Sequence, residues 1–305
     1  MKTKQELKDH LDAIFADGVN MKLYFGLGTG AERAYKLANF DDRATTAVLE
    51  NYVAGVRQFF ENEDLGTVRL SQLDQRSDAL ILYDLQEQPT EFAQLVALQN
   101  EAEPDFFSFD ENAVGDIRTI AIKIASAEQS VVFFKTFYPV SLVKRDQILL
   151  YKLENRFTVF DGDIIKVTPG FDLLLADDEF YINDFAKFEK AFSFTEIAQS
   201  AMLAVVQSIL ALGIVDDVKG YLVACAAPKR DILRAGQSEV LQLGTAVILA
   251  FATQKANKIG LKIVNGQFQL SSRESVKKFY KLSNDDYLTS GLTAFEYETL
   301  AKNKM

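Results

Sequence analysis

The sequence has 305 residues, of which 48% are hydrophobic and 25% charged, a composition typical of a globular protein that can bury a large core. A single cysteine, Cys225, excludes an intrachain disulfide and a disulfide-stabilised secreted fold, so a cytoplasmic protein is expected. The formal net charge of −10 excludes a chain that coats nucleic acid indiscriminately, because most of its surface would repel phosphates.

The amino-terminal part is expected to mix helices and strands. Apolar spacing over residues 4–16 predicts an amphipathic helix, and this charged segment lacks the apolar core of a signal peptide. Residues 21–25 predict a strand, 45–60 a long helix, 79–85 a buried strand and 90–98 a short helix. The only histidine, His10, lies among charged neighbours and is expected to face solvent, so neither a serine–histidine triad nor a histidine-rich metal site is expected.

The central part, residues 117–183, is rich in β-branched and aromatic residues that repeat with a period of two. This pattern predicts an antiparallel β-meander rather than a series of strand–helix–strand units. The expected strands are IRTIAIKI, SVVFFKTF, QILLYKL, RFTVF, DIIKV, FDLLLA and EFYIN. Asn155, Asp161-Gly162 and Pro169-Gly170 supply turns between them.

After residue 183 the apolar spacing becomes helical again. Helices are expected over FAKFEKAF, TEIAQSAMLAVVQSILAL, DVKGYLVACAA, EVLQLGTAVILAFATQKAN and SRESVKKFYKL, with a hairpin over GLKIVNGQFQL. Residues 197–215 are uncharged and reach membrane-spanning length, but Gln199, Ser200, Gln207 and Ser208 interrupt them at helical spacing. We therefore expect a buried helix there, and Cys225 is expected to be a small buried residue.

Together these patterns predict an α+β fold with a mixed amino-terminal region, a central antiparallel β-meander and a mainly helical carboxy-terminal region. Two regions are expected: residues 1–115, which are acidic, and residues 116–305, which hold the meander and a basic helical part. The net charge is −11 over residues 1–118 and +3 over residues 191–305.

Two patterns raise enzymatic alternatives. Gly26, Gly28 and Ala31 match part of the dinucleotide-binding fingerprint, but no parallel strand–helix–strand pattern follows, so a tight loop is expected. Carboxylates also gather at the turns of the meander, where paired carboxylates can hold magnesium in a nuclease. These residues are Asp161, Asp163, Asp172, Asp177, Asp178 and Glu179. Solvated turn residues are favoured over a metal site, because the nearest acid–lysine pattern, Asp217 and Lys219, falls in a segment expected to be helical.

The chain becomes basic between Lys219 and Lys281, where eleven lysines and arginines stand against three acidic residues, a local net charge of +8. A concentrated basic surface is typical of proteins that bind polyanions. Nine of these residues are expected to contact phosphates: Lys229, Arg230, Arg234, Lys255, Lys258, Lys262, Arg273, Lys277 and Lys278. Phe279 and Tyr280 are expected to anchor the last helix in the core rather than to stack on bases. No metal, cofactor or catalytic residue is expected.

From about residue 100 to the end, a series of aromatic and turn motifs follows in a characteristic order. The motifs are FFSFD, SVVFFKTFYPV, KLENRFTVFDGD, FDLLLADDEFYIND, FAKFEKAFSFTEIAQSA and KLSNDDYLTSGLTAFEYETLAK. In this order they resemble the KwaB family, whose members are cytosolic components of the two-gene Kiwa anti-phage defence system.

The resemblance implies a protein that binds DNA, forms a homodimer and pairs with a multi-pass membrane protein, KwaA. It also implies interference with phage DNA replication and late transcription, without a catalytic motif to carry over. We therefore expect a DNA-binding effector that a partner recruits to the inner membrane. A magnesium-dependent nuclease that uses the meander carboxylates, and a protein-interaction scaffold with an aromatic surface, are the two alternatives.

Overall fold

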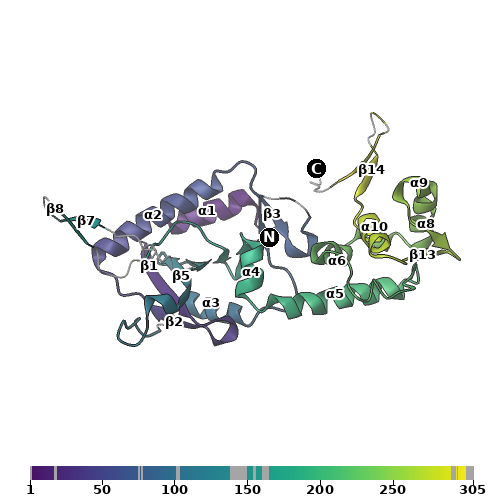
Figure 1. The fold of residues 1–305 in the computed structure, drawn as a ribbon. Helices are drawn as coiled ribbons and strands as arrows, with labels where there is room; N and C mark the ends of the chain where they lie inside the picture. The colour runs from purple at the N-terminus through teal and green to yellow at the C-terminus, as the bar shows by residue number, and fades with distance from the viewer. Residues whose placement is uncertain are drawn as a thin grey trace. The chain divides into compact units, whose positions relative to one another are not determined.

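The computed structural model describes residues 2–16, 19–74, 76, 78–100, 104–137, 150–153, 156–159, 165–289, 293 and 295–299. It divides the chain into two compact units, drawn in Figure 1. Unit 1 comprises Met1–Leu65 and Pro89–Ser193, and unit 2 comprises Gly66–Gln88 and Phe194–Met305. This division does not follow the expected boundary between residues 115 and 116, because the meander strands belong to unit 1 and an amino-terminal segment belongs to unit 2.

Unit 1 is built on an antiparallel run of six strands, in the order β2-β1-β5-β6-β9-β10. The strands are β1 (Asn20–Leu27), β2 (Ala34–Leu37), β5 (Ile117–Ala125), β6 (Ser130–Thr136), β9 (Leu173–Ala176) and β10 (Glu179–Ile182). Phe133 of β6 lies opposite Ile122 on one side and Leu174 on the other. The α+β class is confirmed, and four of the expected meander strands, β5, β6, β9 and β10, are antiparallel neighbours as predicted.

Helices cover both faces of this sheet. They are α1 (Lys4–Ile14), α2 (Asp42–Phe60), α3 (Glu91–Gln99) and α4 (Phe185–Ala191), with the 3₁₀ turns η1 (Gly30–Glu32) and η3 (Val114–Asp116) between other elements. Successive residues of a strand point to opposite faces. Phe133 packs against Tyr52 of α2, with ring centroids 5.3 Å apart, whereas Phe134 packs against Phe192, just after α4, at 4.9 Å. Unit 1 is therefore a sheet between two helical layers, as Figure 1 shows.

Two expected meander strands lie outside this sheet. β7 (Leu150–Leu153) and β8 (Arg156–Val159) form a separate antiparallel pair. The expected strand DIIKV is not seen in its described part, because residues 165–167 lie outside any strand. The turns at Asn155 and Asp161-Gly162 lie outside the described residues.

Unit 2 is mainly helical, with short strands. Its helices are α5 (Phe194–Ala211), α6 (Lys229–Ala235), α7 (Glu239–Gln242), α8 (Thr245–Gln254), α9 (Ala256–Ile259), α10 (Arg273–Ser283) and the 3₁₀ turn η2 (Leu70–Gln72). Its strands are β3 (Gly66–Arg69), β4 (Ala79–Leu82), β11 (Val215–Asp216), β12 (Ile263–Val264), β13 (Gln267–Gln269), β14 (Tyr287–Thr289) and β15 (Glu296–Glu298). The expected hairpin is confirmed at β12–β13, where Asn265 and Gly266 both have positive φ.

α5 buries one face only. Its buried residues, Phe194, Ala198, Met202, Val206 and Ile209, recur at helical spacing, and the last three belong to the core of unit 2. By length and composition it is the one helix in the described ranges that is apolar enough to span a membrane, and 28% of it is buried. The expected buried helix is thus one-sided, with its four polar interruptions exposed.

One expected helix of unit 2 is wrong, and another is wrong in part. The segment DVKGYLVACAA forms turns, because the Asp217 carboxylate accepts hydrogen bonds from the backbone N–H groups of Leu222 and Val223. The segment EVLQLGTAVILAFATQKAN is divided into α7, α8 and α9, with Gly244 at a φ of 88° between the first two. Cys225 is half-buried against the unit 2 core, and burial raises the pKa of its thiol.

Candidate nucleic-acid interface

α10 presents one apolar and one basic side. Ser272 begins the helix by accepting a hydrogen bond from the backbone N–H of Ser275 at 3.1 Å. The residues that pack into unit 2 include Val276, Phe279 and Tyr280, none of which has exposed surface. Phe279 and Tyr280 are therefore core anchors, as expected. Arg273 and Lys277 are exposed, and Lys278 and Lys281 are half-buried, so the four basic residues share the outer side of the helix.

The basic side of α10 adjoins the segment that follows α9. A Cβ built on Gly260 would lie 3.1 Å from Lys278 Nζ, so this ammonium group reaches the backbone between Lys258 and Lys262. We call Lys255, Lys258, Lys262, Arg273, Lys277 and Lys278 the basic face. This face holds six of the nine residues expected to contact phosphates, three on α10 and three around α9, and the contact of Lys278 with Gly260 links the two groups.

Ion pairs limit how many of these charges are available. Lys278 Nζ lies 2.9 Å from Glu274 Oε1, and Lys281 pairs with Glu298. Over the described ranges of the chain, no carboxylate pairs with Lys262, Arg273 or Lys277. These three exposed residues are the part of the basic face best placed to meet a polyanion.

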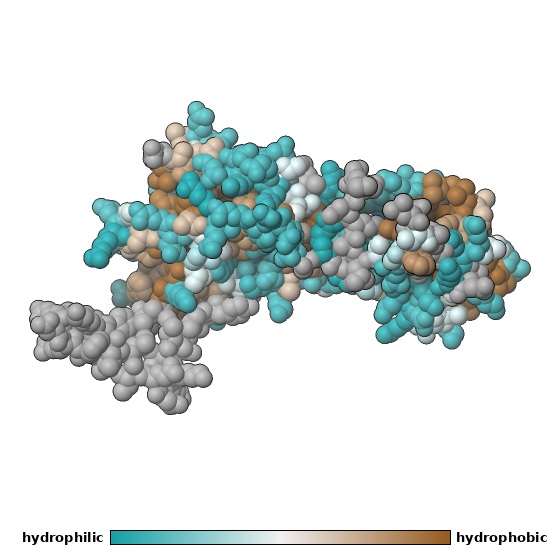
Figure 2. Space-filling model, turned by 90° about the horizontal axis from the view of Figure 1, so that it is seen from above, coloured by the Kyte–Doolittle hydropathy of each residue, from teal (hydrophilic) through white to brown (hydrophobic). Residues whose placement is uncertain are grey.

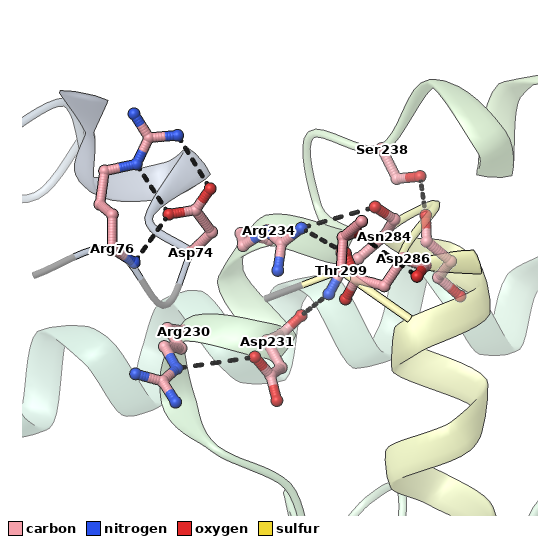
Figure 3. Close-up of polar contacts among 10 residues, drawn as sticks. Asp74, Arg76, Arg230, Asp231, Arg234, Ser238, Asn284, Asp286 and Thr299 are labelled. Atoms are coloured by element: carbon pink, nitrogen blue, oxygen red, sulfur yellow. Dashed lines mark hydrogen bonds and ion pairs between the residues drawn. The ribbon is translucent and has the colours of Figure 1, made fainter. Parts of the chain in front are cut away.

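The three expected phosphate ligands on α6 are arranged differently. Arg234 Nη2 donates to Asp286 Oδ1 at 2.9 Å and to Asn284 O at 3.5 Å, and only 11% of its side chain is exposed (Figure 3). Arg230 Nε lies 3.8 Å from Asp231 Oδ1, and Lys229 is half-buried. Arg234 therefore holds α6 to the end of α10, and its expected role as a phosphate contact is not supported by its geometry.

The carboxylate of Asp231 completes this network. Burial raises its pKa, and the nearby Arg230 and Arg234 offset only part of that effect. Asn284 Nδ2 donates to Asp231 O at 2.9 Å, and the hydroxyl of Ser238 donates to Ser283 O. Figure 3 shows these residues between α6 and α10, where they fix the two helices to each other.

A hollow of about 240 Å³ opens beside the basic face. It is lined by Phe251, Lys255, Lys258, Ile259, Tyr287, Leu288, Tyr297 and Glu298. Burial, and then the charge of Glu298, raise the pKa of Tyr287 to about 12, so its hydroxyl stays protonated. The sequence interpretation missed this hollow, because its wall combines α8 with the distant strands β14 and β15. The one sequence pattern that could have indicated it is α8 itself, an uncharged helix that is followed directly by Lys255.

The meander carboxylates do not form a metal site in the described residues. Asp172 is buried, accepts from Thr136 N at 2.7 Å and pairs with Lys187 at 3.0 Å. Asp177 and Asp178 form the β9–β10 turn with positive φ. Among the described residues, no three metal-ligating side chains gather. Asp161 and Asp163 lie outside the described residues, and Glu179 accepts from the Tyr181 hydroxyl.

Gly28 and Ala31 lie in the tight connection between β1 and β2, as expected, whereas Gly26 lies within strand β1. β1 runs antiparallel to both β2 and β5, whereas a dinucleotide fingerprint needs a parallel strand–helix–strand unit. A Cβ on Gly26 would lie 2.0 Å from Thr119 Oγ1, so the glycine is needed for packing.

His10 does not face solvent, contrary to expectation. Its side chain is 10% exposed, and Nε2 lies 3.3 Å from Asp177 Oδ1. The turn that carries Asp177 covers the histidine, a contact across 167 residues of sequence that local charge patterns do not reveal.

The comparison with known families identifies the family of this chain. The family described as Kiwa protein KwaB-like matches residues 114–293, which is more than half of the chain. The chain belongs to the KwaB-like family. This family membership makes it a component of Kiwa anti-phage defence. The resemblance seen in the sequence is confirmed.

A full-length relative extends this similarity. The chain is 23% identical to the Kiwa protein KwaB of Escherichia coli O55:H7 (strain RM12579 / EPEC), over 99% of each chain. No solved structure matches the chain. The KwaB-like match includes α10 and every residue of the basic face.

Proposed function

We propose that the protein is a DNA-binding effector of Kiwa defence that holds DNA through its phosphates and interferes with phage DNA replication or transcription. The observation that carries the proposal is the basic face, six lysines and arginines on α10 and around α9 in a chain of net charge −10. Phosphate contacts supply most of the sequence-independent affinity of DNA-binding proteins. The binding is therefore tolerant of sequence and confined to one face.

Salt dependence follows from the size of this face. Each neutralised phosphate of duplex DNA releases counterions, and log affinity falls against log salt with a slope of about −0.9 per phosphate. Six contacts correspond to a slope of about −5. A slope near zero would show that the basic face does not meet phosphates.

Charge reversal at the three unpaired positions tests the site. Combining Lys262→Glu, Arg273→Glu and Lys277→Glu should weaken duplex binding about tenfold or more and flatten the salt slope by about 3. The side chains are exposed, so the change should leave the fold intact. Fluorescence anisotropy with a labelled duplex at several salt concentrations measures both quantities.

The matched control reverses three exposed basic residues outside the basic face: Arg43→Glu, Arg69→Glu and Lys190→Glu. The net charge changes by the same amount, so equal losses of affinity in the two variants would contradict a local site.

A parallel series with magnesium tests the non-enzymatic part of the proposal, since the DNA should be recovered uncut. Metal-dependent cleavage would favour a nuclease instead.

We further propose that the protein is cytoplasmic, forms a homodimer and is recruited to the inner membrane by a KwaA-like membrane protein. Membership of the KwaB-like family supports this, because Kiwa defence has partner components. Sedimentation of the purified chain tests the dimer. Co-purification from membranes with and without the partner gene tests the recruitment.

A further inference from the structure

α8 is an apolar helix that its own unit covers incompletely. Its sequence, TAVILAFATQ, has no charge, and a helix that is apolar on all sides is normally buried. Only Ile248 and Ala252 are buried, whereas Val247 is 53% exposed and Phe251 36%. Figure 2 shows hydrophobic residues at the surface in the region where Figure 1 draws α8 and α9.

The hollow beside α8 combines aromatic walls with a cationic rim. Phe251 comes from the helix, and Leu288 and Tyr297, which are 38% and 52% exposed, come from the strands β14 and β15. Lys255 and Lys258 lie at the same hollow. Glu298, which pairs with Lys281, also lines it, so the lining residues themselves include two lysines and one carboxylate.

Size and chemistry restrict the occupant. At about 240 Å³ the hollow is smaller than the roughly 300–1,000 Å³ of sites for drug-sized ligands. A small planar group that carries a negative charge fills it best, because aromatic walls favour stacking and lysines favour the anion. A base-paired duplex offers phosphates and base edges but no unpaired base, because its bases are paired and stacked inside the helix.

We propose that this hollow binds one unpaired nucleobase of DNA by stacking, with the adjoining phosphate against Lys255 and Lys258. The proposal rests on the proposed DNA binding and adds a preference to it. Duplex contacts on the basic face tolerate any sequence, whereas the hollow is filled only where a base has left the helix. The protein is thereby directed to DNA with single-stranded ends or unwound segments.

Three labelled DNAs test this preference: a blunt duplex, the same duplex with a single-stranded thymidine overhang, and the same overhang with abasic sites. The overhang should bind about tenfold more tightly than the blunt duplex, and the abasic overhang should lose this gain, because stacking on aromatic side chains requires a base. 2-Aminopurine placed in the overhang should lose fluorescence on binding.

A paired variant locates the effect. Phe251→Ser with Tyr297→Ser should abolish the preference for the overhang while blunt-duplex affinity stays within about twofold, because the basic face is intact. Both side chains are partly exposed, and circular dichroism checks the fold. The control, Phe106→Ser with Phe109→Ser, removes two exposed aromatics of unit 1 and should keep the preference. If the double variant does not fold, the single variant Tyr297→Leu replaces it. Leucine keeps the wall of the hollow apolar but cannot stack on a base, so the preference for the overhang should still fall.

The outcomes separate the two proposals. Equal affinity for blunt and overhanging DNA would overturn the base-binding hollow and leave DNA binding in place. No affinity for any of the three DNAs would overturn both. A third outcome combines no overhang preference with binding to phosphatidylglycerol vesicles that is lost in the Phe251→Ser, Tyr297→Ser variant. This result would assign the hollow to lipid and overturn the proposal.

Discussion

His10 shows how one residue can report on the packing of unit 1. Burial lowers its pKa below the ordinary value of 6.5, the Asp177 carboxylate acts in the opposite direction, and Lys2 adds to the lowering. Burial is the largest of these effects. The unfolded chain therefore takes up a proton near pH 6.5 and the folded chain only at lower pH. This contribution to stability is present above pH 6.5 and is lost as the pH falls through the folded pKa.

The chain has one histidine, so its imidazole resonance can be assigned without mutagenesis. We expect a titration midpoint below pH 6.5 in the proton NMR spectrum. Asp177→Asn should lower the midpoint further, because it removes the carboxylate that favours the imidazolium. A midpoint above 6.5, or an increase in Asp177→Asn, would contradict this environment.

Residue spacing predicted most of the basic face but not which charges are free. Arg273, Lys277 and Lys278 could be placed on one side of a helix from periodicity alone, since neighbours on a helix are fixed by 3.6 residues per turn. The partner of Arg234, Asp286, is 52 residues away in the sequence, and no local pattern reveals it. The hollow was missed for the same reason, because Phe251 and Tyr297 meet only in the folded unit.

At the scale of elements, strand β1 is held by a close approach at Gly26. The register with β5 shifts at Gly26 and Leu27, and the space for a side chain there is already filled by Thr119, Arg33 and Tyr35. Tight packing makes an added methyl group costly in such a place.

Gly26→Ala should lower the free energy of unfolding by about 1–3 kcal/mol, because the new Cβ overlaps Thr119 Oγ1. Gly66→Ala in β3 is the matched control, since a Cβ there meets no atom within 4 Å, and its effect should stay within about 0.5 kcal/mol. Urea denaturation followed by circular dichroism measures both. Equal effects would show that strand β1 adjusts to the added methyl group without strain.

Element types were predictable where the apolar period was long, as in α1, α2, α10 and the strands from β5 to β10. Helix boundaries were predicted wrongly where a single local interaction outweighs the helical spacing of apolar residues. The Asp217 carboxylate turns the chain at residues expected to be helical, and Gly244 ends one helix and begins the next. β7 and β8 have the composition of sheet strands, but composition does not say which sheet they join.

For the whole molecule, the two units are interleaved in sequence. Unit 2 takes β3, η2 and β4 from residues 66–88 and the rest from residue 194 onward. Charge is divided as well, because unit 1 carries a net charge of −11 and unit 2, which holds the basic face, one of +1. Local propensity gives no sign of this interleaving, which depends on contacts between distant segments.

A fragment of residues 116–305, cut at the boundary that composition suggests, tests the division. It lacks β3 and β4 of unit 2 and two strands and three helices of unit 1, so we expect no cooperative unfolding transition. The full chain, measured by circular dichroism under the same conditions, is the control. A sharp transition in the fragment would show that the contact-based units do not correspond to folding units.

The interleaving of unit 2 also imposes an order on protein synthesis. η2 packs against α6, and the ring of Tyr83 lies 6.2 Å from that of Phe194, but the later residues leave the ribosome after the whole second part of unit 1. At about 5–20 residues per second, the buried strand β4 waits on the order of 5–20 s for these partners. During that interval the nascent chain carries an apolar strand whose partners in unit 2 have not yet been made, which makes it a candidate for chaperone binding.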